Sequence, residues 1–293
     1  MYNPFNESQD DNSCNLNLIK LALEGNREGL EQLIKRHQAW IFNIAFKMTS
    51  DVNDAEDVTQ EILIKILTKL SSYDPEKSAF RTWLYRITAN HIINMKKRTH
   101  ELHLIDIDDI GTSMKRVRNS ENVQMVPDPE SKVLLKEAKS ICLNGMLLCL
   151  DRRQRLVFIL GEILGVTGTI GGEIMEISAA NFRKILSRAR EKLINFFDQK
   201  CGLIDEKNPC RCSLYLKVVS EQGLIDQQKL AKYNRSYPPV SEVTNMGEKN
   251  SEKSYQSLLA ELYGNEAFLD PPNQTAWIRK TIQSQEFKSV FHM

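Results

Sequence analysis

Rings and cations alternate in the stretch FRTWLYRITANHIINMKKR, residues 80–98. Aromatic rings can stack on unpaired bases or wedge between them, while arginine and lysine follow the phosphates. This combination is typical of a surface that binds single-stranded DNA. Phe80, Trp83 and Tyr85 can instead be core residues of an amphipathic helix, and the residue types leave that alternative open.

A second basic stretch, SAANFRKILSRAREKL, covers residues 178–193. Its apolar residues recur at spacings of three and four, which predicts a helix with one buried side and Ser178 as its N-cap. Arginine and lysine can pair with guanine edges or phosphates, and asparagine with adenine. The pattern indicates a recognition helix for the major groove. The alternative is a solvated basic helix.

Three cysteines, Cys201, Cys210 and Cys212, lie close together in the turn-forming segment CGLIDEKNPCRC. They are weak candidates for a zinc site, because the spacing is not CxxC and no fourth ligand is nearby. Redox chemistry and inert thiols are the alternatives. We expect no other cofactor, and we expect Cys142 and Cys149 to be core residues of a helix.

Two helical regions must position these residues. The first is helical almost throughout, with breaks near residues 50–53 and at Asp74-Pro75, and Ser78 is a plausible cap for the helix that follows. Within it, DAEDVTQEILIKILTKL (residues 54–70) combines an acidic first turn with an apolar stripe, so its acidic and amide side chains face solvent.

The predicted fold is all-α, with no β-alternation long enough to build a sheet. The predicted domains are a disordered tail (1–15), a first helical domain (16–98), a linker (99–128), a helix-turn-helix domain (129–200) and a C-terminal extension (201–293). Within the extension, NRSYPPVSEVTNMGEKNSEKS reads as a second linker, and two short helices are predicted around residues 255–263 and 274–287.

Composition restricts the possible functions. The net charge is only +1, so nucleic-acid binding must depend on local basic faces. No apolar run is long enough to span a membrane, and the polar, acidic N-terminus does not read as a signal peptide. Six unevenly spread cysteines argue against a disulfide scaffold and for a reducing compartment. We therefore expect a cytoplasmic protein that does not insert into membranes.

The motifs DAEDVTQE, YDPEKSAFRTWLYRITAN, DRRQRLVFIL and SAANFRKILSRAREKL, in this order, resemble the sigma-70 family of bacterial RNA polymerase subunits, of the short extracytoplasmic-function type. The resemblance covers residues 16–98 and 130–197. It implies two helical domains without an active site, which direct core RNA polymerase to promoters. Single- and double-stranded promoter DNA and a separate anti-sigma protein are the other partners that it implies.

The resemblance also assigns roles to residues. The polymerase-binding positions, which would dock on the clamp helices of the largest subunit, are Asp54, Asp57, Gln60 and Glu61. The positions that would open the −10 element, hold an unstacked base and contact the backbone are Phe80, Arg81, Trp83, Arg86, Asn90, Asn94, Lys96, Lys97 and Arg98. The positions that would lie on the −35 element are Asn181, Arg183, Lys184, Ser187 and Arg188. Extruding a base costs a few kcal/mol, so a preformed pocket is required.

The sequence departs from the family pattern at two places. Glu176 stands where the turn of the helix-turn-helix usually has glycine, and Gly171-Gly172 stand where the scaffold helix usually has Ile-Ala. Each glycine inside a helix costs roughly 0.5–1 kcal/mol relative to alanine. We therefore expect this helix to be weak or displaced, and promoter opening to be the firmer of the two DNA functions.

Two other functions stay open at this point. A stand-alone helix-turn-helix regulator would need only the second domain and would bind DNA without polymerase. A metal or redox sensor would use the cysteines at 201–212, and metal analysis of the purified protein would test it. For the C-terminal extension, our hypothesis is a built-in regulator that folds back on the DNA-binding domains or on polymerase.

Overall fold

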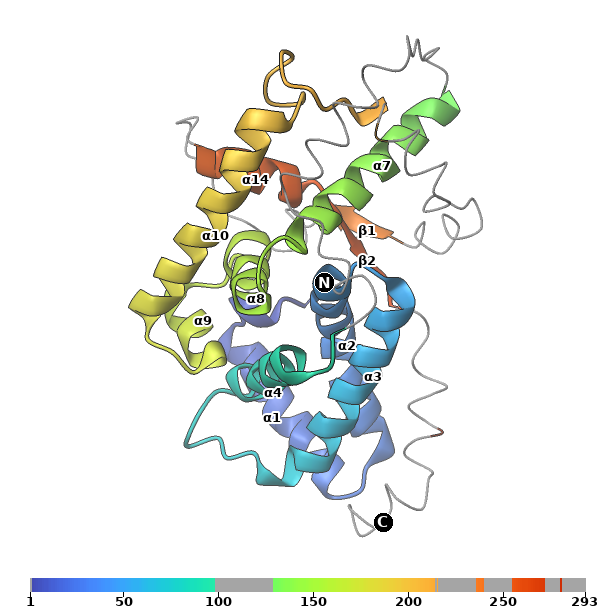
Figure 1. Cartoon of the computed structure of the whole chain (residues 1–293). Coiled ribbons are helices and arrows are strands. Elements are labelled where there is room, and N and C mark those ends of the chain that lie inside the picture. Colours follow the sequence, from blue (N-terminus) through green and yellow to red (C-terminus); the bar gives the residue numbers. More distant parts are fainter. Residues whose placement is uncertain are drawn as a thin grey trace.

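The computed structural model describes residues 2–97, 129–213, 215, 236–239, 255–271 and 280. The first half forms the 3-10 turn η1 (Pro4–Asn6), α1 (Gln9–Leu23), α2 (Arg27–Thr49), α3 (Val52–Lys69), η2 (Leu70–Ser72) and α4 (Phe80–Asn94). The second half forms α7 (Pro129–Leu147), α8 (Arg152–Phe158), the π-helical turn η3 (Ile159–Ile163), α9 (Gly168–Met175) and α10 (Ala179–Lys200). Figure 1 shows the first group in blue to teal and the second in green to yellow.

Two short strands and one helix come from the C-terminal extension: β1 (Ser236–Pro239), α14 (Tyr255–Gly264) and β2 (Ala267–Leu269). The strands pair antiparallel, with Ser236 opposite Leu269. Residues 236–239 were predicted as linker, and that part of the prediction is wrong. A pair this short builds no layer, so the all-α fold class is confirmed, as is the helix predicted near residues 255–263.

The prediction of a disordered tail over residues 1–15 is wrong. Ser8 caps α1 in a reciprocal capping box with Asp11, which satisfies helix amides that would otherwise lack partners. Phe5 is buried and its ring contacts those of Trp40 and Tyr85, with centroids 5.6 and 4.7 Å apart. The segment is therefore part of the first bundle.

One predicted cap is also wrong. The helix after the Asp74-Pro75 turn begins at Phe80, with Ala79 as its N-cap and no side-chain hydrogen bond at that cap. Ser78 contributes its backbone carbonyl, which accepts a hydrogen bond of 3.1 Å from the Tyr73 hydroxyl. The loop is thus fixed by an aromatic side chain of its own.

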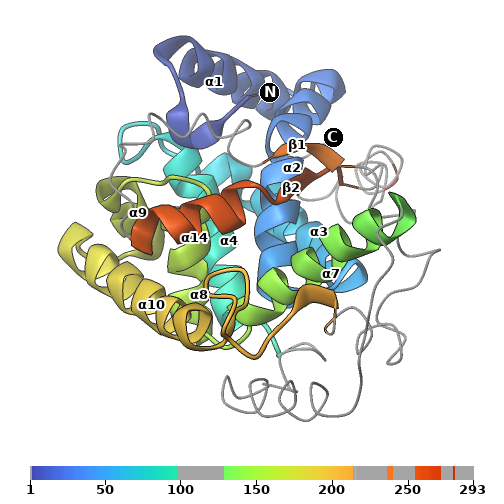
Figure 2. The same cartoon turned by 90° about the horizontal axis from the view of Figure 1, so that it is seen from above.

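The two bundles pack directly against each other, and buried side chains of both join α14 and β2 in one continuous core. Arg155 is fully buried at this junction and donates to the carbonyls of Leu147 (2.9 Å), Leu150 (3.1 Å) and Met48. Met48 belongs to the first bundle, so this guanidinium ties the two together. Figures 1 and 2 both show α4 beside α9.

The predicted linker at 99–128 and the predicted helix at 274–287, apart from Lys280, lie outside the described residues. Within those that are described, no helix combines the length and the apolar character needed to cross a membrane.

Candidate nucleic-acid interface

The acidic face of α3 is set by the helix's apolar stripe. Val58, Ile62 and Ile66 are buried, as the spacing predicted. The N-cap Asp51 accepts a 2.9 Å hydrogen bond from the amide of Asp54, which fixes the start of the helix. The opposite face then carries the four predicted polymerase-binding side chains, of which Asp57 and Glu61 are exposed and Asp54 and Gln60 half-buried.

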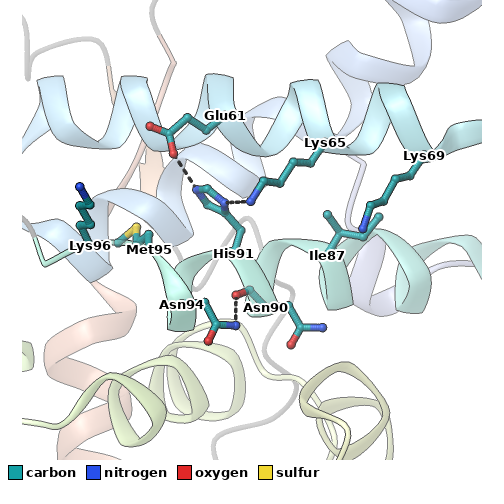
Figure 3. A pocket seen from close by; sticks show the side chains of 9 residues that line it. All are labelled: Glu61, Lys65, Lys69, Ile87, Asn90, His91, Asn94, Met95 and Lys96. Atoms are coloured by element: carbon teal, nitrogen blue, oxygen red, sulfur yellow. Dashed lines mark hydrogen bonds and ion pairs between the residues drawn. The ribbon is translucent and has the colours of Figure 1, made fainter. Parts of the chain in front are cut away.

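A buried histidine links α3 to α4. Lys65 Nζ lies 2.7 Å from His91 Nδ1, and Glu61 Oε2 lies 3.0 Å from His91 Nε2, as Figure 3 shows. A protonated lysine has no acceptor, so it donates to Nδ1 and leaves the ring proton on Nε2, toward the carboxylate. His91 thus holds the two helices in register from the inside.

A cavity of about 510 Å³ opens along this seam. Its lining residues, which Figure 3 labels, are Glu61, Lys65, Lys69, Ile87, Asn90, His91, Asn94, Met95 and Lys96. The volume lies in the range of pockets that hold small organic ligands. Three ammonium groups and two amides can bind a phosphate and the edge of a base.

The sequence had pointed to Asn90, Asn94 and Lys96 but not to Lys65 or Lys69. A signal was available, since Lys65 and Lys69 are four residues apart, as are Asn90 and Asn94, and such pairs share a helix face. What the sequence could not give is that the two faces line the same cavity.

The aromatic residues of the predicted melting surface divide into buried and partly exposed ones. Phe80 is fully buried, so it does not present its ring to DNA in this structure. It supports Trp83, whose ring lies parallel to it, with centroids 5.7 Å apart and an interplanar angle of 25°. Tyr73 packs against both rings. Trp83 and Tyr73 are both half-buried, and of the two predicted rings, Phe80 and Trp83, it is Trp83 that can meet a base.

The predicted cations of α4 have different surroundings. Arg81 Nη1 lies 3.9 Å from the buried carboxylate of Glu7, so it is engaged within the first bundle. Burial is the main cause of the raised pKa of Glu7, and Arg81 opposes that shift. Lys96 and Lys97 are exposed, and Arg98 lies outside the described residues. Arg86 and Asn90 face α9, and Asn94 donates to the carbonyl of Asn90 (2.8 Å).

The recognition helix α10 has the predicted two faces. Ser178 caps it, accepting a 3.2 Å hydrogen bond from the amide of Asn181, and Phe182, Leu186, Ala189 and Leu193 are buried. The exposed face consists of the predicted set, Asn181, Arg183, Lys184, Ser187 and Arg188.

The two departures before α10 have physical explanations. Glu176 adopts the left-handed conformation (φ 54°, ψ 43°), which explains why glycine suits this turn. The expectation that α9 is weak or displaced is wrong, because the helix is formed and packed. A Cβ on Gly171 would lie 2.4 Å from the Phe182 ring, and one on Gly172 would lie 2.8 Å from the carbonyl of Ile177. The glycines therefore let α9 approach α10 closely.

Comparisons with known proteins show which family this arrangement resembles. Residues 33–101, which contain most of α2 and all of α3 and α4, match sigma-70 region 2. The chain is 26% identical over 178 residues to the ECF RNA polymerase sigma factor SigW of Bacillus subtilis, covering 60% of this chain and 92% of that protein. It is 28% identical over 167 residues to the RNA polymerase sigma factor YlaC of Bacillus subtilis, covering 57% and 91%. It is 25% identical over 186 residues to the ECF sigma-E factor of Escherichia coli, covering 61% and 91%.

The family match and these relatives support a sigma-70 family member of the extracytoplasmic-function type. In a sigma factor of this type, the seam between α3 and α4 belongs to region 2, because both helices fall inside the matched residues.

Cys201, Cys210 and Cys212 follow the C-terminal end of α10. The backbones of Cys201 and Cys210 form an isolated β-bridge, in which the amide of Gly202 donates to the carbonyl of Cys210 at 3.0 Å, and both thiols are free. Burial raises the pKa of the Cys210 thiol to about 12, and nearby thiol groups add to the shift. Cys142 of α7 was predicted as a core residue. Burial raises the pKa of its thiol well above the ordinary value, and the nearby Cys210, Cys201 and Cys212 add to the shift.

Raised pKa values keep these thiols protonated at neutral pH, and the protonated form reacts slowly with oxidants. In the described ranges, no three His, Cys, Asp or Glu side chains are arranged to hold a metal ion. The described cysteines therefore lend no support to a redox or metal function.

Proposed function

We propose that this chain is a promoter-specificity subunit that binds core RNA polymerase, directs it to promoters and helps to separate the DNA strands. One observation carries the proposal: the family match falls on helices whose surfaces bear an acidic set on α3 and, beside it, a basic and amide-bearing set on α4. The first suits a protein partner and the second suits DNA. The chain itself supplies no reacting group in this role.

The polymerase side of the proposal uses the outer face of α3. Asp54, Asp57, Gln60 and Glu61 would dock on the clamp helices of the largest subunit. Glu61 also contacts His91, so its replacement would disturb the seam as well as the surface. Asp57 is exposed and is therefore the cleaner residue to change.

The −10 side uses α4 and the cavity. Trp83 would stack on an unpaired base, and the ammonium groups of Lys65, Lys69 and Lys96 would hold the phosphates along the seam. A preformed cavity offsets the cost of extruding a base, which is a few kcal/mol. Phe80 acts in this scheme as the support that orients Trp83.

The −35 side uses α10. Its exposed cations and amides, carried on a helix whose underside is anchored by Phe182 and Leu186, fit a major groove. Replacing one base-contacting arginine should weaken binding by about 1–3 kcal/mol and relax specificity at one position. Arg183 and Arg188 are the candidates for this role.

The decisive experiment measures association with core polymerase and run-off transcription from genomic DNA. We expect Asp57→Ala to weaken association about tenfold, since truncating a charge at an interface costs on the order of 1 kcal/mol or more. Thr68→Ala, at an exposed position near the end of the same helix, is the matched control and should bind normally. If the unmodified chain neither binds core enzyme nor yields a new transcript, the proposal is wrong.

A stand-alone DNA-binding regulator is the second candidate, and the open face of α10 favours it. A gel shift with duplex DNA separates the two functions. Tight, specific binding without polymerase would support the stand-alone regulator, whereas binding that requires core enzyme would support the sigma factor. A separate anti-sigma protein stays a prediction from the family.

A further inference from the structure

Glu173 of α9 and Glu176, the C-cap of that helix, contact polar side chains of α4. Thr82 donates to Glu173 Oε2 at 3.2 Å, and Arg86 Nε donates to the backbone carbonyl of Glu173 at 3.3 Å. Asn90 Nδ2 donates to Glu176 Oε2 at 3.2 Å, and Arg86 Nε lies 3.7 Å from Glu176 Oε1. Carboxylates thus take the positions that phosphates or bases would need.

Charge makes this cover competitive with DNA. Glu176 carries the same sign as a phosphate, and its carboxylate contacts Arg86 and Asn90, which the family resemblance assigns to the −10 element. Helices α9 and α4 are in contact, and Figure 1 shows them next to each other. While this interface is closed, the α10 face is open, whereas a phosphate must displace Glu176 to pair with Arg86.

A segment of the C-terminal extension holds both bundles at once. Phe268 of β2 is buried against Trp40 of α2, with ring centroids 4.9 Å apart. Asn43 forms a reciprocal pair with Leu269, its amide donating to the carbonyl and its oxygen accepting from the backbone amide, both at 2.8 Å. These contacts fix β2 to the first bundle.

The same segment is fixed to the second bundle by α14. Tyr263 is fully buried, donates to the carbonyl of Leu143 at 3.0 Å and meets the Phe158 ring edge-on, with centroids 5.3 Å apart. Glu266, between α14 and β2, accepts a 2.6 Å hydrogen bond from Ser140 of α7. Its charge also acts on the buried Lys47 of α2, so it links the two bundles electrostatically.

We propose that residues 258–269 form an intramolecular clasp that holds the two bundles together and thereby keeps Arg86 and Asn90 in contact with Glu173 and Glu176. The segment joins α2 to α7 and α8, whereas Arg86 and Asn90 meet Glu173 and Glu176 between α4 and α9, so the clasp acts at a distance from the site it controls. Release of the clasp frees Arg86 and Asn90 for contact with the −10 element. The regulatory part of this inference rests on the proposed function.

The test uses the full chain with a point variant, because deletion of the segment would expose a large apolar surface. Phe268→Ala weakens the clasp, and Glu261→Ala is the matched control on the exposed side of α14. Spin labels are placed at Thr68 and Glu191, exposed positions on α3 and α10, through unnatural amino acids so that the native cysteines stay unchanged. Pulsed dipolar spectroscopy then reports the distance between the two bundles.

For the unmodified chain and for Glu261→Ala we expect a single narrow distance distribution. Phe268→Ala should add a longer, broader population, with the ratio of open to closed molecules rising at least tenfold. Run-off transcription with core polymerase should rise at least threefold in the same variant. A double change, Glu173→Gln with Glu176→Gln, should raise transcription without touching the clasp.

Each other result overturns a defined part. An unchanged distance distribution in Phe268→Ala would refute the clasp. Loss of helix content in that variant would assign Phe268 a general packing role, and would also refute it. Opening without increased transcription would refute the regulatory role. If neither the unmodified chain nor any variant gives a transcript, the proposed function is wrong. The distance measurement still decides in that case whether the clasp exists.

Discussion

The nucleic-acid faces of α4 and α10 carry similar residues but differ in what covers them. On α4, Arg86 and Asn90 both contact the carboxylate of Glu176. Arg86 also donates to the backbone carbonyl of Glu173. On α10, Arg183, Lys184 and Arg188 are exposed to solvent. On α4 the chain itself thus supplies partners for these side chains, while the face of α10 is open.

Residue type alone therefore does not determine whether a predicted DNA-binding side chain is free of intramolecular partners. The helix α9 packs against α10 with its glycines and against α4 with its glutamates. It therefore supports the open face and blocks the covered one. Changes at α9 and at the junction of the bundles should separate these two effects.

The largest effect is expected for Arg155→Ala. The buried guanidinium satisfies carbonyls of both bundles, and its loss would leave them without partners and create a cavity. The free energy of unfolding should fall by about 3 kcal/mol or more, measured by urea denaturation. Arg153→Ala, at an exposed neighbouring position, should stay within about 0.5 kcal/mol of the unmodified chain. Equal losses in both variants would contradict this role of Arg155.

A smaller loss is expected for Gly171→Ala. The new Cβ would lie 2.4 Å from the Phe182 ring, so α9 must move away from α10. Overpacking of this kind costs about 1–3 kcal/mol. Gly145→Ala in α7 is the control, because a Cβ there meets nothing within 4 Å and the change should raise stability by about 0.5–1 kcal/mol. A stabilised Gly171→Ala variant would show that the close approach is not required.

Much of this architecture followed from local patterns. The buried stripe of α3, the cap at Ser178 and the two faces of α10 all depend on residues within a few positions of one another. The order of residues 1–15 depends instead on distant partners, such as the hydrogen bond of 2.9 Å from Trp40 Nε1 to the carbonyl of Tyr2. The capping box at Ser8 and Asp11 was the local signal that was missed.

The covered state of α4 could not be read from the sequence for the same reason. Thr82 and Glu173 are far apart in the chain, and neither has a pattern that names the other. The glycine pair shows the opposite case. Helix propensity assigns it a local cost, but the close approach of α9 to Phe182, which leaves no room for a Cβ at Gly171, depends on a residue of another helix.

Acid should affect the two bundles with opposite signs. His37 is buried beneath α4 among the rings of Tyr2, Phe80 and Tyr85, and burial lowers its pKa to about 3. In the unfolded chain His37 takes up a proton near pH 6.5, well before it does so in the folded state. The free energy of unfolding therefore decreases as the pH is lowered. Between pH 7 and 5.5 the loss should be about 1 kcal/mol.

Glu7 in the first bundle and Glu162 in the second have pKa values raised by burial, so the folded state binds their protons first and acid stabilises it. Glu7 therefore offsets part of the His37 effect, whereas the second bundle has Glu162 without a comparable histidine among the residues described. His37→Phe should flatten the pH dependence of the unfolding free energy below pH 7. The same slope in this variant would rule out His37 as its source.

The smallest effect is expected at Glu176, where backbone and charge act in opposite directions. Glycine at this left-handed position should stabilise the turn by about 0.5–1 kcal/mol, because it has no Cβ to clash. Glu176→Gln keeps the backbone cost and weakens the contact with Arg86, a partly exposed pair that contributes at most about 1 kcal/mol. Glu176→Gly should therefore be the more stable of the two variants by about 1 kcal/mol, measured by urea denaturation. Equal stability of the two variants would mean that the left-handed backbone of Glu176 costs no free energy. The contact of Glu176 with α4 would then have no backbone cost to offset.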